Sequence, residues 1–353
     1  MLINLKSSVF RLALAAVFFS APLAAADDPF EIVPVADGVF AAIGRPTAPM
    51  AIGSNAAIIV NADDVLVVDT HLTPAAARAL LGQMARLTDK PVRYVVNTHW
   101  HNDHTQGNRA YVNVFPGGAE YIAQHATRED IVHKAIPFIS DQLSSVPLAI
   151  ARLEEQLAKG VDEQGRALSE AQKQERGLQL SRQNAYLEEL QQMQITLPTL
   201  TFERSLVLHK PGRTLHILFF FKGHTRGDAV VFLPQERVLI TGDLVTHGMP
   251  FPRDSYPSQW AHTLRALAQL DIDQLIPGHG PVQKGKEHVE LLASLFEFLS
   301  EQVRAGVAQG KSLEEIMKAV DLARFQERLP GSSPRLLQAL ERAYNEAGGH
   351  LKD

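Results

Sequence analysis

The alternation of apolar and polar positions divides most of the chain into two similar rounds of short strands and helices. Near-continuous apolar runs bounded by turn residues predict strands that are covered on both faces. In the first round, these runs span residues 30–35, 39–43, 56–60, 65–68 and 92–96. In the second round, they span residues 201–209, 214–221, 229–233, 238–241 and 275–276.

Helical patterns separate and follow these strands. Thr73 suits a helix cap and Pro74 the first helical position, so a helix is expected over residues 74–87. Further helices are predicted over residues 120–134, 258–270, 289–308, 313–320 and 334–344. Strands that alternate with helices in this way predict an α/β fold built in layers.

A change of composition sets residues 140–195 apart from both rounds. β-Branched residues become rare, and Gln, Glu, Leu, Ala and Arg dominate. Ser169 and Gln172 have the spacing of a capping box, which opens the second of two predicted helices. We expect a helical hairpin inserted in one domain, residues 27–310, with the helices of residues 311–353 packed on that domain. The pattern leaves three roles open for this hairpin: a passive decoration, a wall or lid over a site, or a contact in a homo-oligomer.

The first 26 residues have the pattern of a secretory signal peptide. Lys6 and Arg11 precede or flank an apolar run, residues 12–19, and small residues at 24–26 offer a cleavage site. A membrane anchor is the alternative, but the run is short for a span and Pro22 interrupts the segment. We therefore expect a periplasmic or secreted protein with no stable membrane insertion after cleavage.

Composition narrows the classes of function. The chain of 353 residues is 45% apolar, which predicts a folded core, and its net charge of −5 comes without a basic stripe. We therefore expect a small-molecule substrate and no nucleic-acid partner. The chain has no cysteine, so disulfides and thiolate ligands are excluded, which agrees with an exported protein.

The densest group of polar residues follows the strand expected at 92–96. Three histidines and an aspartate fall within six residues, namely His99, His101, Asp103 and His104. His99 and His101 alternate, so they point to one side of an extended segment, while the other two fall in the turn beyond. Imidazole and carboxylate groups are ligands of Zn²⁺, so this one loop offers ligands to two metal ions. The alternative is a polar loop of hydrogen-bonded histidines.

Three later motifs favour the metal site, because each ends a predicted strand with a polar residue. They are Gly223–Asp228 around His224, Thr241–Asp243, and Pro277–Gly280 around His279. Their glycines allow the backbone to turn tightly beside a ligand. Each motif is weak by itself, but together and in this order they are specific.

These motifs resemble those of the metallo-β-lactamase-fold superfamily, over most of residues 30–300. The resemblance implies a four-layer αββα sandwich with the site at one end of the strands. It also implies two Zn²⁺ ions, with the first held by His99, His101 and His224, the second by Asp103, His104 and His279, and a bridge from Asp243.

The branch of the superfamily stays open between glyoxalase II, lactonase and β-lactamase types. The β-lactamase branch with a cysteine ligand is excluded, and His101 stands where diiron flavoproteins carry a glutamate. Asp243 is similar to the bridge of the glyoxalase II and lactonase branches. Asp69 resembles an aspartate of the family that accepts a hydrogen bond from a ligand histidine, the alternative being a plain strand-end turn.

The implied activity is that of an exported dinuclear zinc hydrolase. A metal-bridging hydroxide would attack the carbonyl of an ester, lactone, thioester or β-lactam. Asp103 is expected to be the catalytic residue that orients the nucleophile or carries a proton. Residues 249–252 could form an apolar rim of the pocket. Two alternatives are a mononuclear iron enzyme similar to persulfide dioxygenases and a non-catalytic metal-binding or relay protein of the periplasm.

Overall fold

The computed structural model describes residues 28–329 and 331–351. The expected signal peptide, residues 1–26, lies outside these residues. Among the helices of the described part, none is both long and apolar enough to cross a membrane. The strands of the same part form two sheets, one of seven strands and one of six.

The first sheet contains the first round of predicted strands. Its strands lie side by side in chain order, namely β1 (Phe30–Ala36), β2 (Val39–Gly44), β3 (Ala56–Val60), β4 (Val65–Val68), β5 (Val92–Val96), β6 (Glu120–Gln124) and β7 (Leu200–Phe202). Neighbouring strands are antiparallel from β1 to β4 and parallel from β4 to β7. Every residue of β4 is buried, as expected of an apolar strand between two layers.

The second sheet contains the second round. In spatial order its strands are β13 (Gln283–Lys284), β12 (Gln274–Pro277), β11 (Val238–Gly242), β10 (Val230–Leu233), β9 (Arg213–Leu218) and β8 (Ser205–Lys210). Only the pair of β11 and β12 is parallel among these described strands. Their carboxyl ends therefore meet at one edge of the sheet, where two of the predicted ligand motifs begin.

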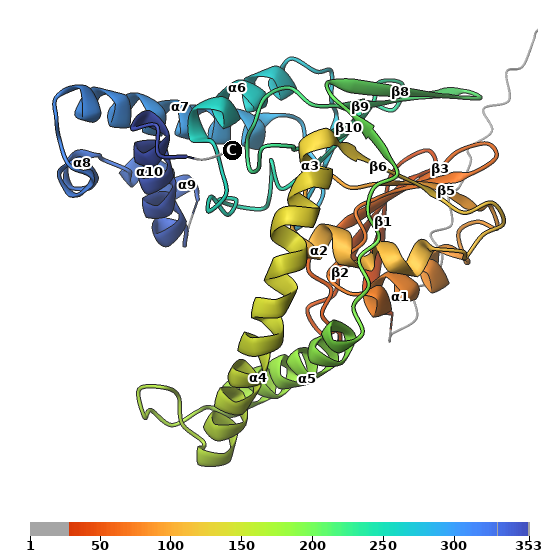
Figure 1. Cartoon of the computed structure of the whole chain (residues 1–353), viewed down its shortest axis with the longest axis horizontal. Helices are drawn as coiled ribbons and strands as arrows, with labels where there is room; N and C mark the ends of the chain where they lie inside the picture. The colour runs from red at the N-terminus through yellow and green to blue at the C-terminus, as the bar shows by residue number, and fades with distance from the viewer. Residues whose placement is uncertain (1–27, 330, 352–353) are drawn as a thin grey trace, which may run out of the picture.

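Helices cover the outer face of each sheet, so the molecule has four layers (Figure 1). Leu80 of α1 (Pro74–Met84) packs on the first sheet, and the side chain of Thr73 caps that helix as predicted. Trp260 and Phe296, from α6 (Pro257–Ala268) and α7 (Glu287–Ala308), pack on the second sheet. A further apolar cluster fills the space between the sheets. The predicted αββα sandwich is confirmed.

The predicted helical hairpin is also present and projects from the sandwich (Figure 1). Its helices are α4 (Ile136–Lys159) and α5 (Glu170–Gln191), and the capping box at Ser169 opens α5. α4 continues from α3 (His125–Asp130) through a π-helical turn, so the hairpin begins earlier than residue 140. Its core, which includes Tyr186 and Leu190, packs against Ala51 and Leu72 of the sandwich.

Two predicted elements are wrong. The helix predicted over residues 120–134 begins as strand β6, which pairs in parallel with β5 on one side and β7 on the other. This pairing outweighs the helical pattern of the local sequence. The strand predicted over residues 201–209 is two strands, because the chain crosses from the first sheet to the second between Phe202 and Ser205.

The sequence predicts two short helices after α7, whereas the described residues contain three. They are α8 (Leu313–Ala319), α9 (Ala323–Arg328) and α10 (Ser333–Ala347). α9 has only six residues and no side-chain cap, so it leaves little pattern in the sequence. Leu336 and Leu340 of α10 are buried in the apolar cluster of α6 and α7, which ties the end of the chain to the second sheet.

Candidate metal centre

The predicted metal ligands lie in loops that follow strands of both sheets. His99 follows β5, Asp243 follows β11 and His279 follows β12, while His224 lies between β9 and β10. A short helix, α2 (Asn102–Thr105), begins directly after His101 and carries the next two ligands. The edge at which these strands end therefore gathers residues that are far apart in the sequence.

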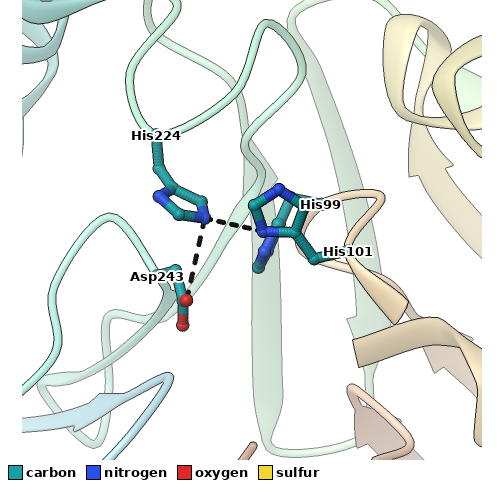
Figure 2. Close-up of side chains that lie close together, drawn as sticks. All are labelled: His99, His101, His224 and Asp243. Carbon is teal, nitrogen blue, oxygen red and sulfur yellow. Dashed lines mark hydrogen bonds and ion pairs between the residues drawn. The ribbon is translucent and has the colours of Figure 1, made fainter. Parts of the chain in front are cut away.

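Four of the predicted ligands form a first group (Figure 2). Their ligand atoms lie within 4.8 Å of one another, and the residues are His99, His101, His224 and Asp243. His101 Nδ1 lies 2.9 Å from His224 Nε2, and Asp243 Oδ2 lies 3.7 Å from the same nitrogen. Three imidazoles and one carboxylate thus converge on one point.

The other three predicted ligands, Asp103, His104 and His279, form a second group, whose ligand atoms also lie within 4.8 Å of one another. Asp103 Oδ2 lies 3.2 Å from His279 Nε2 and 3.6 Å from His104 Nε2. The side chain of His104 is fully buried, whereas those of Asp103 and His279 are partly exposed. This group therefore has one side that is open to a small molecule.

Asp243 lies between the two groups and presents one oxygen to each. Its Oδ2 faces His224, whereas its Oδ1 lies 3.3 Å from the Nε2 atoms of both His104 and His279. The backbone of Gly278 allows this approach, because a Cβ at that position would overlap Asp243 Oδ1. Asp243 therefore contacts histidines of both ligand groups.

Hydrogen bonds orient three of the ligand histidines. Asp69 Oδ2 accepts from His104 Nδ1 at 2.8 Å and from Thr98 Oγ1 at 2.8 Å. Because the Thr98 hydroxyl donates to Asp69, it accepts from His99 Nδ1 at 3.0 Å. Asp254 Oδ2 accepts from Nε2 of the third ring, His101, at 3.0 Å. In each ring the opposite nitrogen is left to face the ligand group.

The electrostatics differ between the groups. Burial lowers the pKa of His224 to about 3 and, together with neighbouring histidines, holds the pKa of His99 well below its usual value. Burial acts in the same direction on His104 and His279, but carboxylates outweigh it. The charge of Asp103 raises the pKa of His104 well above its usual value, and Asp243 raises that of His279 to about 10. The second group therefore attracts positive charge.

The residues of both groups fit metal ions. His99 Nε2 is buried and makes no hydrogen bond, which is costly unless another partner takes that nitrogen. In the second group, His104 Nε2 is likewise buried and makes no hydrogen bond. A metal ion in each group would give these two nitrogens a partner. Imidazole nitrogen and carboxylate oxygen are also the usual ligands of zinc.

Comparison with known families agrees with this geometry. A family model described as the metallo-beta-lactamase superfamily matches residues 50–137 and 174–279, which are more than half of the chain. The chain belongs to this superfamily. The predicted resemblance is therefore confirmed, and the residues between the two matched stretches fall in the helical hairpin.

Members of the superfamily with solved structures share the fold. A metallo-beta-lactamase from Pontibacter korlensis has a TM-score of 0.53 and 18% identity, covering 76% of this chain and 99% of its own. The stereoselective inverting sec-alkylsulfatase Pisa1 from Pseudomonas sp. has a TM-score of 0.61 and 21% identity, covering 90% of this chain and 50% of its own. At these identities the likeness shows the fold.

A curated protein is similar to this chain in sequence. It is a linear primary-alkylsulfatase of Pseudomonas sp. (strain ATCC 19151), 26% identical over 294 residues. The match covers 78% of this chain, which spans half of that relative's length.

A cavity of about 720 Å³ opens on the second ligand group of this superfamily member. This volume is in the range of small-molecule sites. Asp103, Asp243 and His279 lie at one end of it, and the hairpin contributes Phe138 and Tyr186 to its wall. Of the roles that the sequence leaves open for the hairpin, the structure shows a wall of the cavity.

The outcome for the predicted rim, residues 249–252, is mixed. Phe251 lines the cavity, whereas Met249 is buried in the core beside α6. The sequence did not point to Asp254, because its partner His101 lies 153 positions away. It also did not point to Thr98, although a hydroxyl next to a ligand histidine was a signal that could have been used.

Proposed function

We propose that this chain is a hydrolase that uses two zinc ions to cleave a carbonyl compound, namely an ester, lactone, thioester or β-lactam. The observation that carries the proposal is the position of Asp243, whose two carboxylate oxygens face two separate ligand groups. A single ion would need only one of these groups. The arrangement therefore favours two ions over the mononuclear iron alternative.

Zinc, when bound, would lower the pKa of a coordinated water and polarise a substrate carbonyl. Asp103 is the ligand residue best placed to assist, because its side chain is 28% exposed and lines the cavity. Burial opposes its charge, but His104 and His279 hold the pKa of Asp103 well below its usual value. An ionised Asp103 accepts hydrogen bonds, so it can orient the attacking water.

A second candidate is the hydrolysis of a sulfate ester. It is favoured by the similarity to a linear primary-alkylsulfatase, which extends over 78% of this chain. The match covers half of that relative's length, and at 26% identity the sulfatase activity stands as the second candidate. Both candidates use the same cavity and differ in the group that meets Asp103.

We also propose that the protein acts outside the cytoplasm. The support is the signal-peptide pattern of residues 1–26 and the absence of cysteine from the chain. Fractionation of cells that express the full chain tests this. Recovery of a shortened protein in the periplasm or medium is expected, and full-length protein in the cytoplasm would contradict it.

The activity is tested with zinc-loaded protein and four chromogenic or pH-monitored substrates. These are a cephalosporin, a 4-nitrophenyl ester, a simple lactone and a primary alkyl sulfate. Turnover of one of the first three supports carbonyl hydrolysis, and turnover of the sulfate alone supports the second candidate. A thioester is tested in the same way. If zinc-loaded protein cleaves none of these five substrates, the result would favour a non-catalytic metal-binding role.

A further inference from the structure

The cavity is cationic away from the ligand groups. Three arginines line it, namely Arg45, Arg182 and Arg253. The carboxylates that line it, Asp103 and Asp243, both belong to the ligand groups. A substrate that fills this cavity therefore meets positive charge without a competing carboxylate at the end remote from the proposed metals.

Arg253 already has partners. Its Nε donates to Asp254 Oδ2 at 3.2 Å, and its guanidinium lies over the rings of Phe138 and Phe251, at 5.9 Å and 5.4 Å. These contacts connect the hairpin to the loop that follows Asp243. Arg253 is thus accounted for by an ion pair and by packing.

Arg45 and Arg182 make no ion pair with any residue in the described part of the chain. Arg182, on α5, donates from Nε to Ala48 O at 2.9 Å and from Nη2 to Pro46 O. Its guanidinium therefore lies against the segment that begins at Arg45. Arg45 Nε is buried and has no hydrogen-bond partner. Two guanidinium groups without a carboxylate partner among the described residues thus flank one short segment.

Two elements lead from these arginines toward the ligand groups. The segment from Arg45 ends at Gly53, which packs so closely on Asp103 that a Cβ there would overlap the Asp103 side chain. On α5, Tyr186 lies one helical turn after Arg182, about 6 Å along the same face. The rest of the lining mixes apolar side chains, such as Met50 and Leu72, with the amide side chains of Gln142, Gln179 and Gln183.

We propose that Arg45 and Arg182 form a subsite for a carboxylate group of the substrate, remote from the bond that is cleaved. Guanidinium groups bind carboxylates with charge-assisted hydrogen bonds, and both arginines line the cavity without a carboxylate partner among the described residues. The substrate class is then an ester, or a related carbonyl compound, whose apolar chain ends in a carboxylate. This inference rests on the proposed hydrolase function and adds the substrate's second polar group.

The test compares two esters with acyl chains of the same length in the zinc-loaded enzyme. They are 4-nitrophenyl hexanoate and the mono-4-nitrophenyl ester of adipic acid, which differ in the terminal carboxylate. The wild type is expected to prefer the adipate ester in kcat/KM by about tenfold or more. In Arg45→Gln this preference should fall about tenfold, mainly through KM, and Arg182→Lys should weaken it because the fork is lost.

Arg166→Gln is the matched control, because Arg166 is an exposed arginine at the tip of the same hairpin and does not line the cavity. The control should keep the wild-type preference. Equal treatment of the two esters by the wild type, or an unchanged preference in Arg45→Gln, would overturn the proposal. Arg182→Lys could also loosen the segment that Arg182 holds. Arg45→Gln then decides, since the Arg45 side chain makes no ion pair within the described residues and its buried Nε has no hydrogen bond to lose.

A protein that hydrolyses neither ester would contradict the hydrolase function for these substrates, and the subsite is then tested by binding. Metal-free protein is titrated with hexanoate and with hexan-1-ol, with tryptophan fluorescence as the readout, because Trp100 lines the cavity. The subsite predicts that hexanoate binds more tightly than the alcohol and that Arg45→Gln removes the difference. Equal binding of both compounds by the wild type would refute the subsite independently of catalysis.

Discussion

Asp69 and His104 are joined by a hydrogen bond of 2.8 Å across 35 positions of sequence. The carboxylate lies at the end of β4 and also accepts from the backbone N–H and the hydroxyl of Thr98. Asp69 has a φ of +61°, which is unusual for a residue other than glycine. Such backbone strain is typical of sites where a side chain must be held in one place.

Asp69→Asn is expected to weaken metal binding at the second group. Asparagine tolerates the positive φ, but it has one acceptor oxygen where Asp69 uses two, Oδ1 for the Thr98 N–H and Oδ2 for Thr98 Oγ1 and His104 Nδ1. Loss of such a partner typically lowers metal affinity by about 10- to 100-fold. Zinc affinity is measured by competition with a chromogenic chelator. The control Asp63→Asn lies in an exposed turn and should keep the zinc affinity of the wild type. Wild-type zinc affinity in Asp69→Asn would contradict the role of Asp69 in orienting His104.

Gly278→Ala is expected to disrupt both ligand groups. The added Cβ would overlap Asp243 Oδ1, so this carboxylate must move away from the point between the groups. Loss of bound metal in both sites should follow, as measured by elemental analysis of the dialysed protein. Gly177→Ala makes the same change in α5, where a Cβ has open space, and should leave metal content unchanged while stabilising the fold by about 0.5–1 kcal/mol. Normal metal content in both variants would argue against the central place of Asp243.

His71 makes the metal-free protein sensitive to acid. This residue is buried, stacks on Phe30 and has its pKa lowered by burial to about 4. Between about pH 6.5 and pH 4, the unfolded chain takes up a proton at this position whereas the folded protein does not. The free energy of unfolding should therefore fall as the pH falls through this window, by about 3 kcal/mol at most from this group.

Chemical denaturation at pH 7 and pH 4.5 measures that effect in protein treated with a chelator. His71→Asn, which suits the positive φ of 69° at this position, should show a smaller loss of stability on acidification than the wild type. His209→Asn changes an exposed histidine and should retain the full loss. The same loss in all three proteins would show that His71 does not contribute.

Asp103→Asn separates catalysis from the first ligand group. The substitution removes the carboxylate charge that lines the cavity, and a reduction in kcat of about a hundredfold or more is expected. Metal at the first group should remain, because none of its ligand atoms belongs to Asp103. Steady-state kinetics with elemental analysis of the same sample make the comparison. Turnover close to that of the wild type would exclude the assigned role of Asp103.

The fold was predictable wherever local pattern and tertiary structure agree. β4 is continuous in sequence and buried on both faces, and Thr73 and Pro74 open α1 as expected. The strand at residues 120–124 was not predictable, because it depends on pairing with β5 and β7. Such pairing leaves no pattern in the local sequence. The division between β7 and β8 was hidden for a similar reason, since the chain changes sheets within an otherwise extended stretch.

The candidate site was predictable to the extent that its residues stand in short motifs. His99, His101 and the residues that follow are close in the sequence, and the later ligands each end a strand. Asp254 belongs to none of these motifs, and only the folded chain brings it to His101. The same holds for Arg182 of the hairpin, which the folded chain brings to the carbonyls of Pro46 and Ala48, next to Arg45.

The central claim is that Asp243 joins two metal sites, and metal counting in wild type and Asp243→Ala tests it most directly. The account predicts two zinc ions per wild-type chain and at most one in the variant, because each ligand group loses an oxygen. Both proteins are purified in parallel, loaded with zinc, dialysed and measured by elemental analysis. One iron per wild-type chain with oxygen consumption, or two tightly bound zinc ions in Asp243→Ala, would contradict the account.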